Sequence, residues 1–384
     1  MALQLPATAA DYRRLARSRL PGFLFDYVDG GASDEKTLEA NLSGWAEINL
    51  RQRVLVNVDR VDTAATLAGQ PCSMPLALGP VGFAGMMARR GEAQAALAAE
   101  AVGVPFTLST VGICPLAEVT KAVGAQAIWF QLYMLRDRAV VQALLQRAWD
   151  AGCRTLVFTV DLPVSGMRHR DTRNGLDSGG AGARLIRAQQ LLSRPSWLWD
   201  VGVRGGPHSF GSLVDHVAGA RDMDAFKTWL DAQFDPGVTW TDIDWLRGQW
   251  KGALLLKGVL DVEDAQAAVR AGVEGVIVSN HGGRQLDGVA STAAKLPAIV
   301  RAVGRETEVL VDGGVRSGVD VFRAVALGAR GVLIGRPWVW ALAAAGQRGV
   351  TDLLTRWRRE LLLAMTLTGA TSLAEVDLSR LDRS

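Results

Sequence analysis

The feature that most constrains the fold is a short apolar segment that recurs eight times along the chain. Each copy is rich in Val, Ile, Leu or Phe and ends close to a residue that favours turns. The copies are residues 75–80 (PLALGP), 105–109 (PFTLS), 127–133 (AIWFQLY), 154–161 (RTLVFTVD), 253–258 (ALLLKG), 275–280 (GVIVSN), 308–314 (EVLVDGG) and 331–336 (GVLIGR). Because apolar residues follow one another instead of alternating with polar ones, we predict strands that are buried on both faces.

Helical patterns occupy the stretches between these segments, including residues 91–102, 137–151, 262–271 and 319–327. Strand–helix units repeated eight times predict an α/β fold in which the strands close into a parallel (β/α)8 TIM barrel. An open, doubly wound sheet is the alternative, but units of similar size favour closure. In a barrel the active site lies at the carboxyl ends of the strands, where this chain places polar or ionisable residues.

Some segments stand outside the repeat. Helical patterns at 8–19 and 23–27 precede it, and residues 162–252 form an insertion too long for an ordinary connection. The insertion holds six of the twelve tryptophans, so we expect a lid or a docking element. The expected parts of this single domain are a leading helical segment (1–74), the barrel strands (75–161 and 253–336), the insertion (162–252) and C-terminal helices (337–384).

Composition limits the class of protein. Hydrophobic residues make up 49% of the chain and charged residues 21%, which is typical of a globular core. Forty-two basic against 39 acidic side chains leave a formal net charge of +3, too balanced to indicate a nucleic-acid partner. Cys72, Cys114 and Cys153 are scattered without a CxxC motif, so we expect neither a metal site nor disulfides, and a reducing cytoplasm is the natural compartment. Prolines interrupt the long uncharged stretch 63–88, so no transmembrane span is expected.

The most informative motif is SNHGGRQLD at residues 279–287, directly after the sixth predicted strand. His281 is the side chain best suited to proton transfer near neutral pH. Gly282 and Gly283 allow the backbone to approach a ligand closely, and Arg284 can bind a carboxylate with two hydrogen bonds. The alternative is a capped loop with a solvated His–Arg pair.

A second group follows the fourth predicted strand. Thr159 and Asp161 end that strand, and Arg168 comes seven residues after the aspartate. A carboxylate at this place could orient His281 and stabilise its cationic form. Arg168 would be a second carboxylate anchor. The alternative for Asp161 is a residue that merely caps the next turn.

A third group has the composition of a phosphate site. Loops after the last two strands of such barrels commonly bind phosphate, because glycine-rich backbone supplies N–H donors and arginine supplies charge. Lys257, at the end of the fifth strand, adds a cation that faces the mouth of the barrel. The loop residues are Asp312, Gly313, Gly314, Val315 and Arg316 after strand seven, with Gly335 and Arg336 after strand eight.

Further polar side chains stand at other strand ends. Ser109 ends the second strand, and Gln131 and Tyr133 lie within the third. Tyrosine is scarce, with three in the chain, so Tyr133 stands out. The alternative interpretation of Tyr133 is a half-buried aromatic residue with a solvated hydroxyl. Tyr27 has a helical pattern around it and could equally be a packing residue.

Taken together, these motifs resemble one family, the FMN-dependent L-2-hydroxy-acid dehydrogenases and oxidases, and within it the bacterial respiratory enzymes that act on L-lactate. The similarity runs from about residue 11 to residue 373, nearly the whole chain. It is carried by SNHGGRQLDG (279–288), STVGICP (109–115), WFQLYMLRDR (129–138), LVFTVD (156–161), PHSFGSL (207–213) and AMTLTGA (364–370).

The resemblance implies a role for each matching residue. His281 would be the catalytic base, paired through its other ring nitrogen with Asp161. The substrate carboxylate would be bound by Arg168 and Arg284, and the substrate oxygens by Tyr27 and Tyr133. Tyr133 would also take part in catalysis. The implied contacts to FMN are Pro80, Val81 and Gly82 near N5; Ser109, Gln131 and Thr159 at the polar edge of the ring; Lys257 and Ser279 near N1 and O2; and Asp312, Gly313, Gly314, Arg316, Gly335 and Arg336 around the ribityl phosphate.

The implied reaction converts a 2-hydroxy acid into a 2-oxo acid as FMN gains two electrons. His281 would take either the proton on C2 or the hydroxyl proton, and the sequence leaves both open. Val111 lies where relatives vary the size of the substrate pocket, and a medium aliphatic residue favours lactate over the bulkier mandelate. Gly82 and Met87 occupy other variable pocket positions.

The insertion bears on the electron acceptor. Residues 183–194 (ARLIRAQQLLSR) form a basic amphipathic pattern that places Leu185, Ile186, Ala188, Leu191 and Leu192 toward one side, followed by Trp197 and Trp199. Such a segment can lie on an anionic membrane face, so we expect peripheral association with the cytoplasmic side of the inner membrane and a quinone or another respiratory component as acceptor. The alternative is a lid packed on its own barrel or on a neighbouring subunit.

Other functions remain open from the sequence. An oxygen-using oxidase is the main rival among enzymes, and a non-catalytic flavin- or phosphate-binding barrel is the rival of another class. An isomerase-type barrel gives no reason for the HGGR motif. Relatives often assemble as tetramers, so a homo-oligomer is expected.

Overall fold

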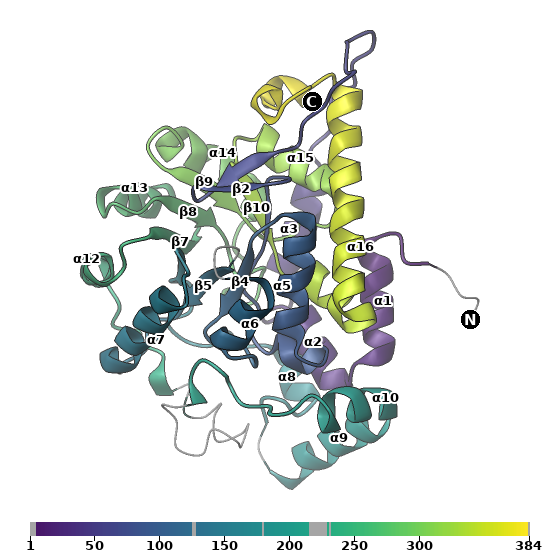
Figure 1. Cartoon of the computed structure of the whole chain (residues 1–384), viewed down its shortest axis with the longest axis vertical. Helices are drawn as coiled ribbons and strands as arrows, with labels where there is room; N and C mark the ends of the chain where they lie inside the picture. The colour runs from purple at the N-terminus through teal and green to yellow at the C-terminus, as the bar shows by residue number, and fades with distance from the viewer. Residues whose placement is uncertain (1–4, 125–127, 179, 215–228, 230–231, 383–384) are drawn as a thin grey trace.

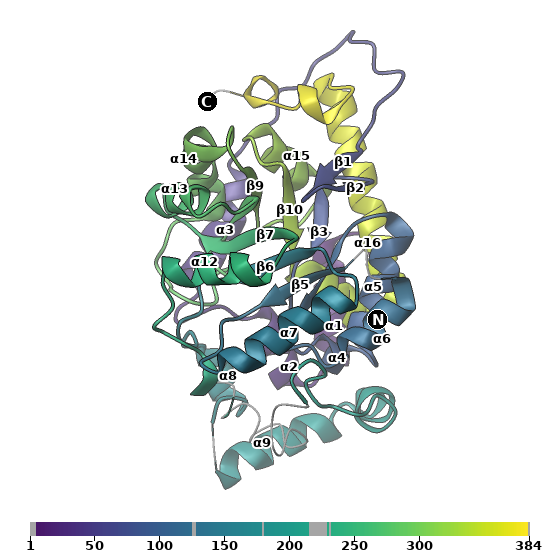
Figure 2. The same ribbon diagram turned by 60° about the vertical axis from the view of Figure 1, so that its left-hand side comes forward.

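The computed structural model describes residues 5–124, 128–178, 180–214, 229 and 232–382. Within them, eight parallel strands close into a barrel in the order β10-β3-β4-β5-β6-β7-β8-β9 (Figures 1 and 2). The strands are β3 (Leu76–Leu78), β4 (Phe106–Ser109), β5 (Ile128–Leu132), β6 (Thr155–Thr159), β7 (Ala253–Val259), β8 (Gly275–Val278), β9 (Glu308–Val311) and β10 (Gly331–Ile334). Each strand overlaps one of the eight predicted segments, so the TIM barrel is confirmed; residue 127 lies outside the described residues.

Helices cover the outside of the barrel. Those that follow successive strands are α5 (Gly91–Val102), α6 (Leu116–Val123), α7 (Arg138–Asp150), α12 (Trp240–Gln249), α13 (Val262–Arg270), α14 (Thr292–Val303), α15 (Gly318–Ala326) and α16 (Arg336–Thr368), with the short α4 (Ala84–Met87) before α5. The four helical patterns predicted between strands agree with α5, α7, α13 and α15 to within one residue at each end. Side-chain caps define the starts: Asp137 accepts from the N–H of Ala139 at 3.0 Å, and Asp261 from that of Glu263 at 2.9 Å.

The leading segment is helical in its first part. It contains α1 (Ala9–Arg19), α2 (Gly22–Asp29) and α3 (Lys36–Ala46). Helix α1 begins with a capping box between Thr8 and Asp11 and packs along α16 (Figure 1). Helix α16 contains a break at Ala345 and Gly346, where the backbone leaves helical values, and two short 3-10 turns, η4 (Leu373–Glu375) and η5 (Leu378–Arg380), follow it.

The end of the leading segment is not helical, which corrects the expectation for residues 1–74. It forms an antiparallel hairpin of β1 (Ala65–Leu67) and β2 (Gln70–Cys72). Buried Leu67 and Cys72 pack against the side chains that fill the barrel interior, and Gln70 accepts from the indole N–H of Trp129 at 2.8 Å. The interior side chains are Ala77, Trp129, Val157, Leu255, Ile277, Leu310 and Leu333. The hairpin thus closes the amino-terminal end of the barrel and leaves a site to form at the other end.

The insertion lies over the carboxyl ends of the strands. It contains α8 (His169–Arg173), α9 (Ala181–Leu192), α10 (Pro195–Trp197) and the π-helical turn η2 (Leu198–Val203) before α12. Helix α9, which corresponds to the predicted amphipathic pattern, and α10 form the lower end of the molecule, below α2 and α8 (Figures 1 and 2).

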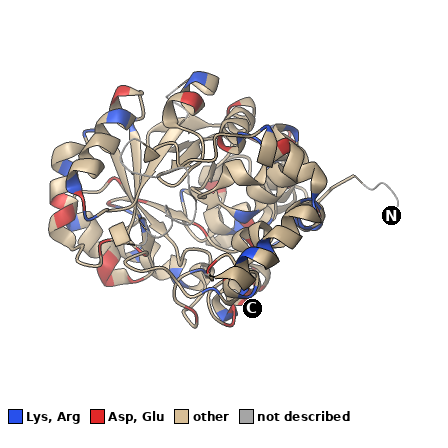
Figure 3. Ribbon diagram, turned by 90° about the horizontal axis from the view of Figure 1, so that it is seen from below, with Lys and Arg blue, Asp and Glu red and all other residues tan. Residues whose placement is uncertain are grey.

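Charge is spread over the outside of the molecule. Figure 3 shows basic and acidic residues together around the ring of outer helices, in keeping with the net charge of +3. Among the helices in the described ranges, none combines the length and apolar character needed to span a bilayer.

Candidate active site at the carboxyl end of the barrel

A cavity of about 570 Å³ opens at the carboxyl end of the barrel, between the strand ends, α2 and the insertion. Four of the predicted site residues, Ser109, Gln131, Asp161 and Ser279, are not part of its lining. The predicted residues that line it are Tyr27, Pro80, Val81, Gly82, Tyr133, Thr159, Arg168, Lys257, His281, Arg284, Asp312, Gly313, Gly314, Arg316, Gly335 and Arg336. The fold therefore gathers residues from seven strand ends and from α2 around one space.

His281 and Asp161 meet at this cavity. The Nδ1 atom of His281 lies 2.7 Å from Oδ1 of Asp161, although one residue follows β8 and the other follows β6. His281 has a left-handed backbone with φ of 56°, which costs a residue other than glycine roughly 1–2 kcal/mol. Its N–H donates to the hydroxyl oxygen of Ser279 at 3.1 Å, which helps to hold this conformation.

The surroundings keep His281 neutral and Asp161 ionised. Burial lowers the pKa of His281, and although Asp161 raises it, Lys257 and Arg284 lower it further. Burial alone would raise the pKa of Asp161, but His281 and Lys257 outweigh that effect and lower it. An ionised carboxylate accepts the proton of Nδ1–H, so Nε2 of the neutral imidazole carries the lone pair of a base.

Two arginines bring positive charge to the same cavity. Arg284 donates to the carbonyls of Tyr27 and Gly30, the latter at 3.2 Å, and its guanidinium carbon lies 5.0 Å from the Tyr27 ring centroid. Burial, together with the charge of Arg168, lowers the pKa of Arg284 to about 10, so the side chain stays protonated at neutral pH. Arg168 donates to the carbonyl of Arg284 at 3.4 Å, and its distance to the carboxylate of Asp171 is 3.9 Å. These cations are suited to bind a carboxylate.

The two predicted tyrosines line the cavity as hydroxyl donors. Tyr27 packs edge-on against Phe83 with ring centroids 5.1 Å apart, and Tyr133 against Phe234 at 5.6 Å. Burial raises the pKa of both hydroxyls, and the charge of Asp161 raises that of Tyr133 further. Both hydroxyls are therefore protonated at neutral pH.

Lys257 is a buried cation at the end of β7. Its Nζ lies 2.9 Å from the carboxylate of Asp312 and donates to the hydroxyl of Ser279 at 2.9 Å. Burial alone would lower the pKa of Lys257, but the carboxylates of Asp312 and Asp161 outweigh it and raise the pKa. The ammonium group thus keeps its charge inside the barrel.

Several buried polar atoms at the site have no hydrogen-bond partner among the described residues. They include Nε2 of Gln131, Oγ1 of Thr159, Oδ1 of Asp312 and Oδ2 of Asp161. Ser109 donates to the amide oxygen of Gln131 at 3.0 Å, which leaves the amide nitrogen of Gln131 to another partner. A buried polar group without a partner costs about 1–3 kcal/mol. The atoms of Gln131 and Thr159 fit a planar ligand with polar edges, such as a flavin ring.

The loops predicted to bind phosphate both reach the cavity. Arg316 lines the cavity, and burial lowers its pKa to about 10. Arg336 also lines the cavity, and its guanidinium donates to three backbone carbonyls. These carbonyls belong to Asp29, Gly30 and Gly282, at 3.2, 2.8 and 2.8 Å. The region that remains for a phosphate at this loop is the N-terminus of α16, which begins at Arg336.

Two glycines of the predicted site motifs, Gly283 and Gly314, lie close to helix α3. A Cβ on Gly314 would lie 1.9 Å from the carbonyl oxygen of Asn41 in α3, and one on Gly283 would lie 2.7 Å from the nitrogen of Leu38. Both glycines have positive φ, 83° and 73°. Close approach to a ligand, which was predicted for Gly282 and Gly283, therefore needs correction at Gly283: its missing side chain makes room for α3.

Some cavity residues were not predicted from the sequence, and one was misplaced. Asp171 is buried and lines the cavity three residues after Arg168, a spacing that brings side chains together on a helix. Burial raises its pKa, against the influence of the two arginines. Val111 lines the cavity as expected, whereas Met87 is fully buried outside the lining and its neighbour Met86 takes that place.

The outer face of the insertion exposes large apolar side chains, but not all those predicted. Leu185, Leu192 and Trp199 are 71%, 73% and 61% exposed, whereas Leu191 lines the cavity. Trp197 corrects the expected pair of aromatic anchors, because it is 2% exposed and its indole N–H donates inward to the carbonyl of Met86 at 2.9 Å. The apolar side of α9 is therefore divided between the protein and the solvent.

A TIM barrel with ionisable side chains around a cavity at its carboxyl end is the architecture of an enzyme. The model of the FMN-dependent dehydrogenase family matches residues 16–383. An L-lactate dehydrogenase of Caulobacter sp. (strain K31) is 54% identical over 98% of this chain and 99% of its own length, and one of Chromohalobacter salexigens is 50% identical over 96% and 94%. Among solved structures, the monotopic membrane protein (S)-mandelate dehydrogenase is similar with a TM-score of 0.92 and 33% identity, covering 99% of this chain and 100% of that one. A mandelate oxidase has a TM-score of 0.82 and 39% identity over 98% of both chains.

The chain therefore belongs to the FMN-dependent dehydrogenase family. It is an oxidoreductase that uses FMN, as the sequence motifs predicted.

Proposed function

We propose that this enzyme oxidises L-lactate to pyruvate and passes the electrons to a membrane quinone. The oxidation of a 2-hydroxy acid is supported by one observation: the His281–Asp161 pair, Arg168 and Arg284 lie together at one cavity. A 2-hydroxycarboxylate needs cations for its carboxylate and a base for a proton lost on oxidation. The relatives named L-lactate dehydrogenase, at 50% and 54% identity, favour lactate among such acids.

The proposed reaction assigns each group a task. Arg168 and Arg284 bind the substrate carboxylate, and Tyr27 and Tyr133 donate to the substrate oxygens. Neutral His281 takes up one of the two protons that the substrate loses. The Asp161 carboxylate holds the ring in position and stabilises the imidazolium that forms.

The site residues also fit FMN. Bound FMN supplies the two-electron acceptor chemistry that side chains lack. The unpartnered atoms of Gln131 and Thr159, with Ser109, would hold the ring, and Lys257 and Ser279 would lie at its electron-rich edge. Arg316, with the loop backbone after β9 and the N-terminus of α16, would hold the phosphate. The backbone of residues 80–82 lines the same cavity.

The electron acceptor is inferred from the insertion. Exposed Leu185, Leu192 and Trp199 form an apolar outer face, and Leu191 and Leu198 of the same elements line the active-site cavity. An acceptor dissolved in the membrane would meet this cavity directly if that face lay on the bilayer. The solved neighbour described as a monotopic membrane protein supports such docking. The cytoplasmic side of the inner membrane is our proposal for where this enzyme docks.

A second candidate is a larger 2-hydroxy acid such as (S)-mandelate. The TM-score of 0.92 to a mandelate dehydrogenase favours it. The first experiment adds L-lactate, D-lactate or (S)-mandelate to the anaerobic yellow protein and follows flavin absorbance. Rapid bleaching by L-lactate alone is expected; bleaching by (S)-mandelate at a much higher kcat/KM would replace lactate. Reoxidation by a quinone analogue compared with oxygen then separates a dehydrogenase from an oxidase.

A further inference from the structure

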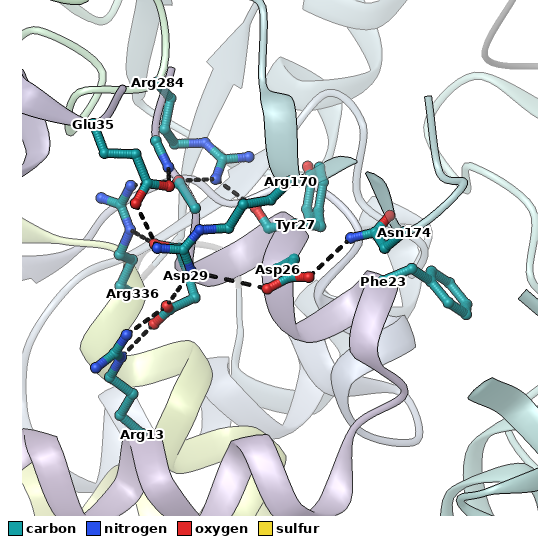
Figure 4. A network of polar contacts seen from close by, with 12 residues as sticks. Arg13, Phe23, Asp26, Tyr27, Asp29, Glu35, Arg170, Asn174, Arg284 and Arg336 are labelled. Carbon is teal, nitrogen blue, oxygen red and sulfur yellow. Dashed lines mark hydrogen bonds and ion pairs between the residues drawn. The ribbon is translucent and has the colours of Figure 1, made fainter. Parts of the chain in front are cut away.

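We propose that Arg170, on helix α8 of the insertion, is a positioning residue that fixes the substrate-binding groups of α2 and α8 relative to one another. This inference rests on the proposed function, because it concerns how the substrate carboxylate is bound. A network of ion pairs and hydrogen bonds connects Arg170 with the end of α2 (Figure 4).

Arg170 stands at the centre of that network. Its guanidinium donates to Asp29 at 2.9 Å and to Glu35, and lies 3.8 Å from Asp26. Arg13 of α1 donates to both oxygens of Asp29, at 2.5 and 2.7 Å. Burial alone would raise the pKa of Asp29, but the two arginines outweigh it and lower the pKa, so the carboxylate is ionised. Arg170 thereby joins α8 to the last turn of α2.

This junction lies directly behind the proposed substrate anchors. Arg168, two residues before Arg170, is the N-cap of α8, and Tyr27, two residues before Asp29, lies in α2. Arg284 donates to the carbonyl of Tyr27 and to that of Gly30, so it too is held against the end of α2. A shift of α8 relative to α2 would therefore move Arg168 away from Tyr27 and Arg284.

The insertion also holds the first turn of α2. Gln190 of α9 accepts from the N–H of Phe23 at 2.6 Å and donates to the carbonyl of Asn174 at 3.2 Å. Asn174 in turn donates to the carboxylate of Asp26 at 3.1 Å. Helix α2 is thus bonded to the insertion at both ends, but the ionic contact at Asp29 and Glu35 comes from Arg170 alone among the residues of the insertion that the structure describes.

The test compares Arg170→Met, Arg170→Lys and Glu35→Gln with Arg173→Met, which alters an exposed arginine of the same helix. KM and kcat for L-lactate are measured with FMN content and melting temperature. The Kd for oxalate, a carboxylate that the enzyme cannot oxidise in this way, is measured from flavin absorbance. Because misplacement of a binding group by about 1 Å can cost on the order of 10²-fold, Arg170→Met should raise KM and the oxalate Kd roughly tenfold to a hundredfold.

The expected pattern separates positioning from a structural role. In Arg170→Met, kcat should change far less than KM and FMN content should stay as in the wild type; Arg170→Lys should recover part of the affinity, and Glu35→Gln should give a smaller loss. Should Arg170→Met fail to fold, Glu35→Gln still carries the test. Unchanged KM and oxalate Kd would overturn the proposal, as would equal losses in Arg173→Met or a loss of melting temperature alone. If wild-type enzyme does not oxidise lactate, the proposed function fails, while oxalate binding still reports on Arg170.

Discussion

Asp161 Oδ1 and His281 Nδ1 lie 2.7 Å apart, although 120 residues separate them in the chain. Burial of the pair, together with Lys257 and Arg284 nearby, lowers the pKa of His281 and leaves a neutral imidazole beside an ionised carboxylate. Because its pKa is lowered, His281 remains an unprotonated base at pH values where an ordinary histidine would already be protonated. This property also makes His281 the first residue to test.

Replacing His281 by Ala should leave FMN bound, because the other groups that would hold FMN remain. The rate of flavin reduction by L-lactate should fall by on the order of 10²–10⁴-fold, the usual contribution of a positioned general base. Stopped-flow absorbance under anaerobic conditions measures this rate. A near-normal rate in the variant would remove His281 from the mechanism.

The pH dependence follows from the lowered pKa of His281. The active form has a neutral imidazole, so kcat/KM should be full above this pKa and should decline as pH falls through it. The midpoint should lie below about 6.5, the ordinary histidine value. Because Asp161 raises the pKa of His281, Asp161→Asn should move the midpoint to still lower pH and also reduce the rate. A midpoint above 6.5 in the wild type would contradict the assignment.

Lys257 and Asp312 should depend on each other for stability. In Lys257→Met the buried carboxylate of Asp312 loses the ammonium that lies 2.9 Å from it, which typically costs about 3–5 kcal/mol. Chemical denaturation of the FMN-free protein should show this loss. The double variant Lys257→Met/Asp312→Asn removes both charges and should be more stable than the single one. Equal stability of single and double variants would mean that the pair is not coupled.

Membrane binding should depend on the outer face of α9. Burying a leucine side chain contributes about 1.5–3 kcal/mol, so Leu185→Glu/Leu192→Glu should weaken sedimentation with anionic phospholipid vesicles at least about tenfold. Leu378→Glu, at a 57% exposed leucine in η5, is the matched control and should bind vesicles as the wild type does. Soluble turnover with a dye acceptor should be unchanged in both proteins. Undiminished vesicle binding by the α9 variant would refute docking through this face.

Gly314 should be required for folding because α3 packs closely against it. Gly288→Ala, at φ of 86° with nothing near the new methyl group, should cost roughly 1–2 kcal/mol for the left-handed backbone. Gly314→Ala has a similar φ, 83°, but its methyl group would meet the carbonyl of Asn41 at 1.9 Å. Its free energy of unfolding should therefore fall well below that of Gly288→Ala. Equal losses in the two variants would show that α3 can move away.

The barrel and much of the site could be predicted from the sequence because both depend on local patterns. Continuous apolar runs indicate strands buried on both faces, and residues at strand ends share one face of a barrel whatever lies between them. His281, Asp161 and Lys257 could therefore be assigned to the same end of the barrel before any distance was known. The hairpin β1–β2 was missed because strands of three residues carry little periodicity.

Only the tertiary structure decided what each residue faces. An exposed Leu192, a cavity-lining Leu191 and a buried Trp197 come from one predicted amphipathic segment, and their environments depend on how α9 and α10 pack on the rest of the protein. Likewise, a glycine at 314 indicates close approach, but the sequence does not name Asn41 as its neighbour. The partners of Arg170, Asp29 and Glu35, likewise became known only from the tertiary structure. The sequence by itself determined the strands and the chemically capable side chains, because these follow from residues near in the chain; long-range packing set their partners, because contacts between distant segments leave no periodic pattern in one sequence.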